Sequence, residues 1–132
     1  MVNILIISHS LKIAEGTKEL AEEMKQNDLK IEIVGGTADG KLGTDPDQIE
    51  NNLRTMDSED GIIVLADLGS AVMSFNMVKE WLPKKMQNKI KLADAPIVEG
   101  AVLGAIEASL GKNLEQVLAV IEKKSLINKN NF

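Results

Sequence analysis

The sequence has no cysteine and no tyrosine, and it has a single histidine, His9. Because the unperturbed pKa of histidine lies close to neutral pH, His9 is the first candidate for covalent or acid–base chemistry. A metal site built from histidines is not expected, since it would draw on more than one imidazole. The lack of cysteine is compatible with a cytoplasmic protein, because cytoplasmic proteins rarely contain disulfides.

Long hydrophobic segments and basic runs are also absent from the sequence. No apolar segment approaches the roughly 20 residues that span a bilayer, and the short N-terminal one lacks the basic region of a signal peptide. The net charge is −5, with no basic run that could neutralise nucleic acid phosphates. We therefore expect no membrane partner and no nucleic acid partner, whereas a basic protein partner is compatible with the acidic charge.

The length and composition indicate one globular domain. The 132 residues are enough for a buried core, and we expect residues 1–132 to form a single domain with a polar C-terminal tail at 126–132. Hydrophobic residues make up 44% of the chain and aromatic residues only 2%, so the core should be aliphatic.

Apolar segments alternate with segments of helical periodicity. Four segments are predicted as strands, at residues 2–7, 30–34, 61–65 and 89–92. One helical pattern lies between each two consecutive strands, and two more follow the last strand. The predicted fold class is therefore α/β, a three-layer αβα domain with a mainly parallel four-stranded sheet in the order 2-1-3-4.

The helical segments carry start signals and apolar faces. Side chains placed to cap a helix are Ser10, Asp45, Ser70 and Asn113. The first helix is predicted to bury Ile13, Gly16 or Thr17, Leu20 or Ala21, and Met24. The helix that ends before Pro83 is predicted to bury Val72, Phe75 or Asn76, Lys79 and Leu82. The small residues between Gly100 and Ala108 are predicted as core, with a dimer face as the alternative.

Polar residues follow the first and third strands where each strand ends. Ser8-His9-Ser10 follows the first strand, and Asp67 follows the third. In the order 2-1-3-4 these two strand ends are neighbours, in the crevice where open α/β sheets place their sites. If Asp67 bonded one imidazole nitrogen of His9, it would fix the tautomer and leave the other nitrogen nucleophilic. The alternative is that Asp67 is only a turn residue.

Two segments near these strand ends could bind an anion through backbone N–H groups. Gly69-Ser70-Ala71 opens a helix, where free N–H groups and the helix dipole favour negative charge. Gly36-Thr37 lies in a glycine-rich turn that would let a phosphate approach the backbone. With Ser10, these residues are the predicted phosphate-binding residues, and an ordinary helix cap and a flexible turn are the alternatives. Together with His9, they favour a histidine that accepts a phosphoryl group.

Two other function classes fit the sequence poorly. A serine hydrolase is disfavoured because no G-x-S-x-G segment is present to form a nucleophile elbow. Nucleotide binding by this chain alone is not expected, because it has no Walker A motif and no G-x-G-x-x-G after the first strand.

Several blocks of the sequence occur together, in a fixed order, in a known family. The blocks are Ile7–Ser10, Ala14–Gly16, Gly35–Thr37, Asp39-Gly40, Gly43-Thr44, Asp67–Ala71 and Ala95–Ala101. In these blocks the chain resembles the mannose-type IIA family of the phosphoenolpyruvate:sugar phosphotransferase system (PTS), over almost its whole length. It is most similar to the DhaM branch, which serves dihydroxyacetone kinase. The resemblance implies the mannose-type IIA fold and a homodimer.

The resemblance also implies a phosphocarrier that uses no cofactor. The protein HPr, phosphorylated by enzyme I, would pass its phosphoryl group to Nε2 of His9, while Asp67 orients the ring. The phosphohistidine would then phosphorylate ADP held by the DhaL subunit, and the resulting ATP would phosphorylate dihydroxyacetone on DhaK. HPr would be a separate protein, since the chain ends after the IIA domain.

Two alternatives share the same histidine. One is a sugar-transport IIA component that donates its phosphoryl group to a IIB domain. The other is a regulatory binding module in which phosphorylation of His9 is only a signal. The identity of the partner distinguishes these functions.

Overall fold

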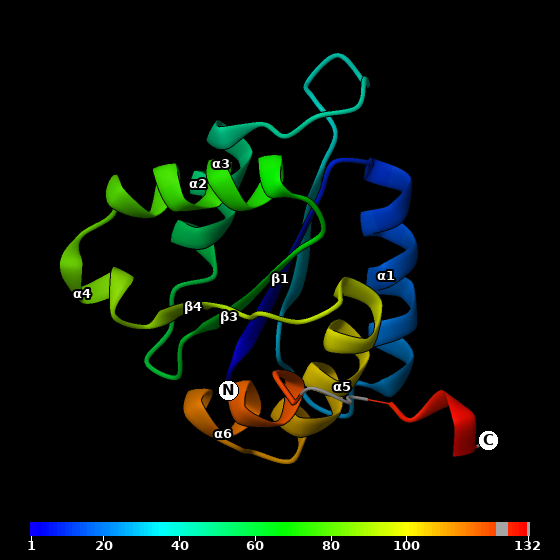
Figure 1. Ribbon diagram of the computed structural model, residues 1–132. Helices are drawn as coiled ribbons and strands as arrows, with labels where there is room; N and C mark the ends of the chain where they lie inside the picture. The colour runs from blue at the N-terminus through cyan, green and yellow to red at the C-terminus, as the bar shows by residue number, and fades with distance from the viewer. Residues whose placement is uncertain (124–126, 132) are drawn as a thin grey trace.

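The computed structural model describes residues 1–123 and 127–131 and contains one parallel sheet with helices on both faces (Figure 1). The sheet order β2-β1-β3-β4 confirms the predicted order, and each neighbouring pair is parallel. The strands are β1 (Asn3–Ser8), β2 (Ile31–Gly35), β3 (Ile62–Ala66) and β4 (Ile90–Leu92). All four carboxyl ends therefore lie along one edge of the sheet.

The helices divide between the two faces of the sheet. One face is covered by α1 (Leu11–Met24), α5 (Ile97–Ser109) and α6 (Leu114–Ile121). The other face is covered by α2 (Pro46–Thr55) and α3 (Gly69–Glu80), and the short α4 (Lys84–Gln87) leads from α3 to β4. The predicted three-layer architecture is confirmed, although α4 was not predicted from the sequence.

Two aliphatic cores form because β1 and β3 are buried on both faces. Leu5, Ile7 and Val64 pack with α2 and α3, and Phe75 fills this second core. Ile4 and Ile6 pack with α1, α5 and α6 in the first core. The alanines of α5 lie in this first core, which confirms the prediction that its small residues are core residues.

The helix α1 is rotated relative to the sequence prediction. Ile13, Leu20 and Met24 are 48%, 47% and 40% exposed, whereas the buried residues are Ala14, Thr17 and Ala21. Small side chains on the buried face let α1 lie close to β2 and α5. The buried Thr17 hydroxyl donates a hydrogen bond to the carbonyl of Ile13 at 2.7 Å. The prediction of this buried face was therefore wrong for the three large residues.

In α3 and just after it, the predicted burial of Phe75 and Leu82 is confirmed, but two other positions and the start of the helix differ from the prediction. Ala71, Phe75 and Val78 are its buried residues, while Val72 and Lys79 are only half-buried. The predicted cap by Ser70 was also wrong, because the N-cap residue is Leu68 and no side chain caps this helix. The other three predicted caps are confirmed, because the side chains of Ser10, Asp45 and Asn113 accept hydrogen bonds from helix N–H groups.

The C-terminal residues 127–131 are exposed and include a short 3-10 helix, η1 (Lys129–Asn131). Lys129 pairs with Glu99 of α5 at 2.9 Å, and this pair lowers the pKa of Glu99. Residues 126 and 132 of the predicted tail lie outside the described residues. In the described part of the chain, no helix has the length and apolarity needed to cross a membrane.

Candidate functional site

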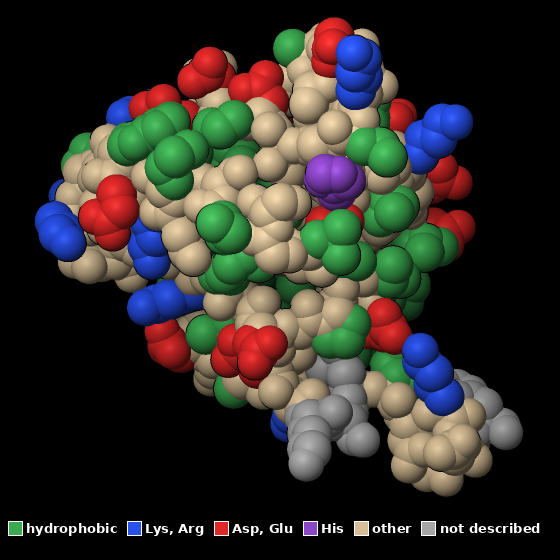
Figure 2. All heavy atoms as spheres, turned by 45° about the horizontal axis from the view of Figure 1, so that its top comes forward, with side chains coloured by type: hydrophobic (Ala, Val, Ile, Leu, Met, Phe, Trp, Pro, Cys, Tyr) green, Lys and Arg blue, Asp and Glu red, His purple; other side chains and the backbone are tan. Residues whose placement is uncertain are grey.

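His9 lies where β1 ends and α1 begins, beside the carboxyl end of β3. The parallel register pairs Ile7 with Ala66, so Asp67, the first residue after β3, reaches the segment Ser8–His9. Figure 2 shows the histidine at the molecular surface, with hydrophobic side chains around it. The structure therefore brings His9 and Asp67 together, as the order of the strands predicted.

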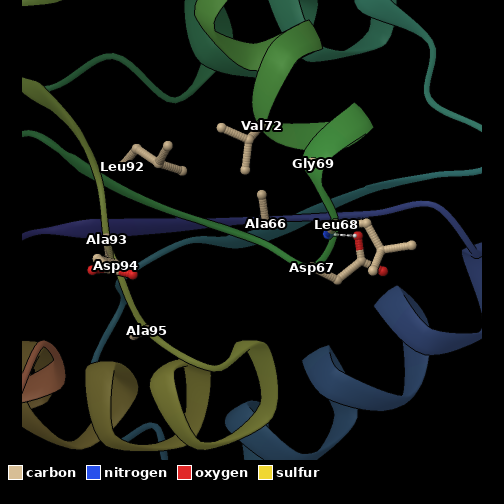
Figure 3. Close-up of a pocket in the computed structure, with 9 residues that line it drawn as sticks. All are labelled: Ala66, Asp67, Leu68, Gly69, Val72, Leu92, Ala93, Asp94 and Ala95. Carbon is tan, nitrogen blue, oxygen red and sulfur yellow. Dashed lines mark hydrogen bonds between the residues drawn. The ribbon is translucent and has the colours of Figure 1, made fainter. Parts of the chain in front are cut away.

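The carboxylate of Asp67 binds the main chain around His9. It accepts hydrogen bonds from the Ser8 hydroxyl at 2.6 Å and from the His9 backbone N–H at 3.2 and 3.3 Å. It also accepts one from the backbone N–H of Leu68 at 2.7 Å (Figure 3). The Ser8 oxygen in turn accepts a hydrogen bond from the backbone N–H of Ser10 at 3.0 Å. Asp67 thus fixes the backbone on both sides of the crevice.

This arrangement differs from the predicted contact between Asp67 and the imidazole ring. Among the described residues, the ring nitrogen Nδ1 of His9 has one polar neighbour within hydrogen-bond range, the Ser70 hydroxyl at 3.5 Å. The nitrogen Nε2 takes part in none of the hydrogen bonds between the described residues. Since Nδ1 faces α3, Nε2 is the nitrogen left for a reacting group.

Two helix N-termini meet at His9. The helix α1 begins two residues after it, at Leu11, and α3 begins at Gly69. The first N–H groups of an α-helix have no partner within the helix, and the dipole gives this end a partial positive charge. The predicted residues Gly69, Ser70 and Ala71 form the first turn of α3, so their N–H groups point out of the end of that helix. The Ser10 hydroxyl accepts a hydrogen bond from Ile13 N–H at 3.4 Å.

Two contacts at its C-terminal end hold the glycine-rich loop between β2 and α2 near the site. The N–H of Gly43 donates to the carbonyl of His9 at 2.8 Å, and the hydroxyls of Thr44 and Ser74 lie 2.9 Å apart. Sequence reasoning assigned no role to Ser8 or to this Thr44–Ser74 contact. No pattern in one sequence predicts such a contact, because it joins residues from different elements.

The two residues of this loop predicted to bind phosphate serve the loop itself. The N–H of Thr37 donates to the Lys41 carbonyl at 2.8 Å, which closes the loop. Gly36 has φ +71°, and a Cβ there would lie 2.9 Å from the same carbonyl oxygen. The Thr37 hydroxyl also binds Asp39 and lowers the pKa of that carboxyl. Thr37 therefore does not present a free backbone N–H to the site.

Exposed leucines surround His9. Leu11, Leu42 and Leu68 are 47%, 69% and 55% exposed. A cavity of about 530 Å³ lies between the start of α1 and the glycine-rich loop, with Leu11 and Leu42 in its lining. A second, of about 410 Å³, lies at the ends of β3 and β4, with Asp67 and Asp94 on its rim (Figure 3). Exposed apolar groups beside a reactive nitrogen suit docking of another protein.

Comparison with known proteins identifies the family of this site. The model of the family described as "PTS system fructose IIA component" (EIIA-man) matches residues 3–118. The chain belongs to this family. Among its relatives is a protein of Listeria innocua named "PEP-dependent dihydroxyacetone kinase 2, phosphoryl donor subunit DhaM". The two are 36% identical over 118 residues, which cover 89% of this chain and 94% of the relative.

Two further matches extend this comparison. The DhaM subunit of Escherichia coli is 34% identical over 89% of this chain, but the match covers only 26% of that longer protein. A crystal structure of a protein of unknown function is 41% identical, covers 92% of this chain and 93% of its own, and has a TM-score of 0.84. The match therefore covers 94% of the Listeria DhaM subunit and about a quarter of the Escherichia coli one.

Proposed function

We propose that this chain is the phosphoryl donor subunit of a PTS-dependent dihydroxyacetone kinase, with His9 as the phosphorylated residue. Phospho-HPr would be the donor and ADP on DhaL the acceptor, and the ATP formed would phosphorylate dihydroxyacetone on DhaK. Seven DhaM subunits match the chain, which supports this assignment. The observation that carries it is the Nε2 of the single histidine, which has no hydrogen-bond partner among the described residues and lies where two helix N-termini meet.

The chemistry that we propose is an in-line exchange of one phosphoryl group. The lone pair of His9 Nε2 attacks the phosphorus of phospho-HPr, so an N–P bond forms on His9 as the N–P bond of the donor breaks. The proton of the His9 ring stays on Nδ1 and points toward the Ser70 oxygen. The first N–H groups of α1 and α3 stabilise the phosphoryl oxygens, because charge spreads over these oxygens in the transition state.

Discharge takes place in the same site, with phospho-His9 now as the phosphoryl donor and ADP as the acceptor. A terminal oxygen of ADP attacks the phosphorus, the N–P bond of His9 breaks, and the electron pair returns to Nε2. Asp67 holds the His9 backbone through both steps. Each partner would dock against the leucines around His9 and exclude water, and we propose that this exchange takes place in the cytoplasm. We propose a homodimer, as in the family.

Intact-mass measurement tests the proposal. With phosphoenolpyruvate, enzyme I and HPr, the protein should gain one acid-labile phosphoryl group, and the His9→Ala variant should gain none. DhaL loaded with ADP should then remove the group as ATP forms. Labelling of the His9→Ala variant would contradict the site, and a stable phosphoprotein in the presence of DhaL would contradict the acceptor.

A sugar-transport IIA component is the second candidate, because the matching family model is described by a sugar PTS component. In that function, phospho-His9 would donate to a IIB domain. Discharge to a IIB domain but not to DhaL would favour it.

A further inference from the structure

A line of large apolar side chains runs along the exposed side of α3. Met73, Met77 and Trp81 are 73%, 46% and 45% exposed, although all three are large hydrophobic residues. Their spacing of four places them on one side of the helix. We call these three residues the α3 ridge. Figure 2 shows hydrophobic side chains gathered over this part of the surface.

The α3 ridge is continuous with the phosphoryl site. The Ser70 hydroxyl lies 3.5 Å from the His9 ring, and Met73 follows one turn later on the same helix. At 1.5 Å per residue, Trp81 lies about 16 Å along the helix from Ser70. A protein that brings a reacting group to His9 over α3 would therefore cover this ridge.

Lysines surround the far end of the ridge. Lys79, Lys84 and Lys91 are close enough for their charges to act on one another, and within residues 1–123 and 127–131 none of them forms an ion pair. Burial, and then repulsion from Lys91 and Lys84, lower the pKa of Lys79 against the attraction of Glu80. This positive cluster stands out on a chain of net charge −5. Carboxylates of a partner would relieve its internal repulsion.

Electrostatics distinguishes the two proposed partners. The donor brings one phosphoryl dianion to an unphosphorylated histidine. The acceptor brings ADP, itself a polyanion, to a histidine that already carries a phosphoryl group. The second encounter places two anions together and needs the larger compensating attraction, which the lysines at the far end of the ridge supply through carboxylates of the partner.

We infer that the α3 ridge, with Lys79, Lys84 and Lys91 at its end, is the docking surface for the nucleotide-bearing acceptor, through an apolar patch bordered by carboxylates on that protein. This inference rests on the proposed function and assigns one of its two partners to one side of His9. The donor would use other contacts around the histidine, such as those of Leu11 and Leu42.

A double variant tests the surface without touching the site. In Met77→Ser/Lys84→Glu, both changes lie on exposed residues of the ridge and its lysine cluster. The matched control is Leu110→Ser/Lys123→Glu, which makes the same kinds of change at exposed residues on the other face of the sheet, at the ends of α5 and α6. Single-turnover rates are measured for loading by phospho-HPr and for discharge to ADP-loaded DhaL.

We expect the discharge rate of the ridge variant at subsaturating DhaL to fall at least about tenfold, as for loss of a docking hot spot. Its loading rate should stay within about twofold, and the control should match wild type in both steps. Added salt should slow wild-type discharge more than discharge of the ridge variant, because the lysine contribution is screened. Thermal unfolding of both variants checks that they are folded.

Two results would overturn the inference. In one, the folded ridge variant discharges to DhaL at the wild-type rate. In the other, loading falls as much as discharge, which would make the ridge a surface for the donor as well. Failure of wild type to load, or to discharge to DhaL, would instead count against the proposed function, so the two failures are distinguishable.

Discussion

At the scale of single residues, the carboxylate of Asp67 joins the carboxyl ends of β1 and β3. Its oxygens accept hydrogen bonds from Ser8, His9 and Leu68, at distances between 2.6 and 3.3 Å. A carboxylate only accepts, so all three donors are satisfied together. His9 therefore owes the position of its backbone to a residue 58 positions away in the sequence.

The variant Asp67→Asn should lose both activity and stability. The amide turns a donor toward the Ser8 hydroxyl or the His9 N–H, and leaving such a group unpaired costs about 1–3 kcal/mol of unfolding free energy. We expect the rate of phosphoryl transfer to His9 to fall about tenfold or more as the histidine shifts. Single-turnover transfer from phospho-HPr and thermal unfolding measure the two effects.

The matched control is Asp94→Asn, which changes an exposed carboxylate that lines the same cavity as Asp67, at the ends of β3 and β4. It should transfer phosphoryl groups at the wild-type rate. If Asp67→Asn also did so, Asp67 would be only a turn residue.

The sequence predicted which residues meet but not which atoms bond. Strand order alone placed Asp67 beside His9. Whether the carboxylate reaches the ring or the backbone depends on the geometry of the turn at Leu68, which residue types do not determine. For the same reason, Thr37 was predicted to face a phosphate, whereas its N–H closes its own loop.

At the scale of elements, the contact between β2 and α1 positions the start of α1. A Cβ on Gly35 would lie 2.7 Å from the Cα of Leu11 and 3.0 Å from the carbonyl oxygen of Ser10. Gly35→Ala should therefore push α1 away from the sheet and destabilise the protein by about 1–3 kcal/mol. Transfer to His9 should slow as well, because its helix N-terminus moves.

The variant Gly16→Ala is the matched control in α1. A Cβ at Gly16 would have no neighbour within 4 Å in the described part of the chain, so alanine should stabilise the helix by about 0.5–1 kcal/mol. Urea unfolding of both variants measures the difference. Equal stability of the Gly35→Ala variant and wild type would mean that β2 and α1 separate at little cost.

The lysine cluster at the C-terminal end of α3 predicts a pH-dependent stability. Because the pKa of Lys79 lies below its usual 10.5 in the folded protein, the unfolded chain binds this proton more tightly. Lys79→Gln should therefore stabilise the protein at neutral pH, by less than about 1 kcal/mol because the group is partly exposed. The gain should vanish as the pH rises through the folded pKa toward 10.5.

Unfolding free energies measured across this pH range, with Lys123→Gln as the control at an exposed lysine that follows α6, check the sign. A gain that grew with pH would contradict the lowered pKa of Lys79.

Helix positions were predicted more accurately than helix faces. Five of the helices and all four strands occur where periodicity placed them, because spacing and caps are local signals. The buried faces of α1 and α3 were predicted only in part, because the large residues expected on the buried face of α1, and Val72 of α3, are not buried. Side-chain size favoured Ile13 and Leu20, but close packing on the sheet selected Ala14 and Ala21, and only the tertiary fit determines that choice.

At the scale of the whole molecule, one sheet is shared by two cores. Ile4 faces the core under α1 and α5, while Leu5 faces the core under α2 and α3. Because both residues belong to β1, loss of either core should unfold the other, and we expect a single cooperative transition.

The variant Ile4→Ala tests this coupling and should cost about 2–5 kcal/mol. Trp81, the single tryptophan, lies at the end of α3 on the opposite face of the sheet. Its fluorescence and far-UV circular dichroism should therefore shift to lower urea together. A fluorescence transition that stayed at the wild-type midpoint would show that the two layers unfold separately.

Because the four strands run in the same direction, their amino ends lie together at the end of the molecule opposite His9. The turn Asp57–Gly61, which precedes β3, lies at that end, and Glu59 is exposed on it. Since the sequence has no cysteine, Glu59→Cys would introduce the only thiol. A protein coupled to a solid support or a dye through that thiol would present its reactive edge outward, in one uniform orientation.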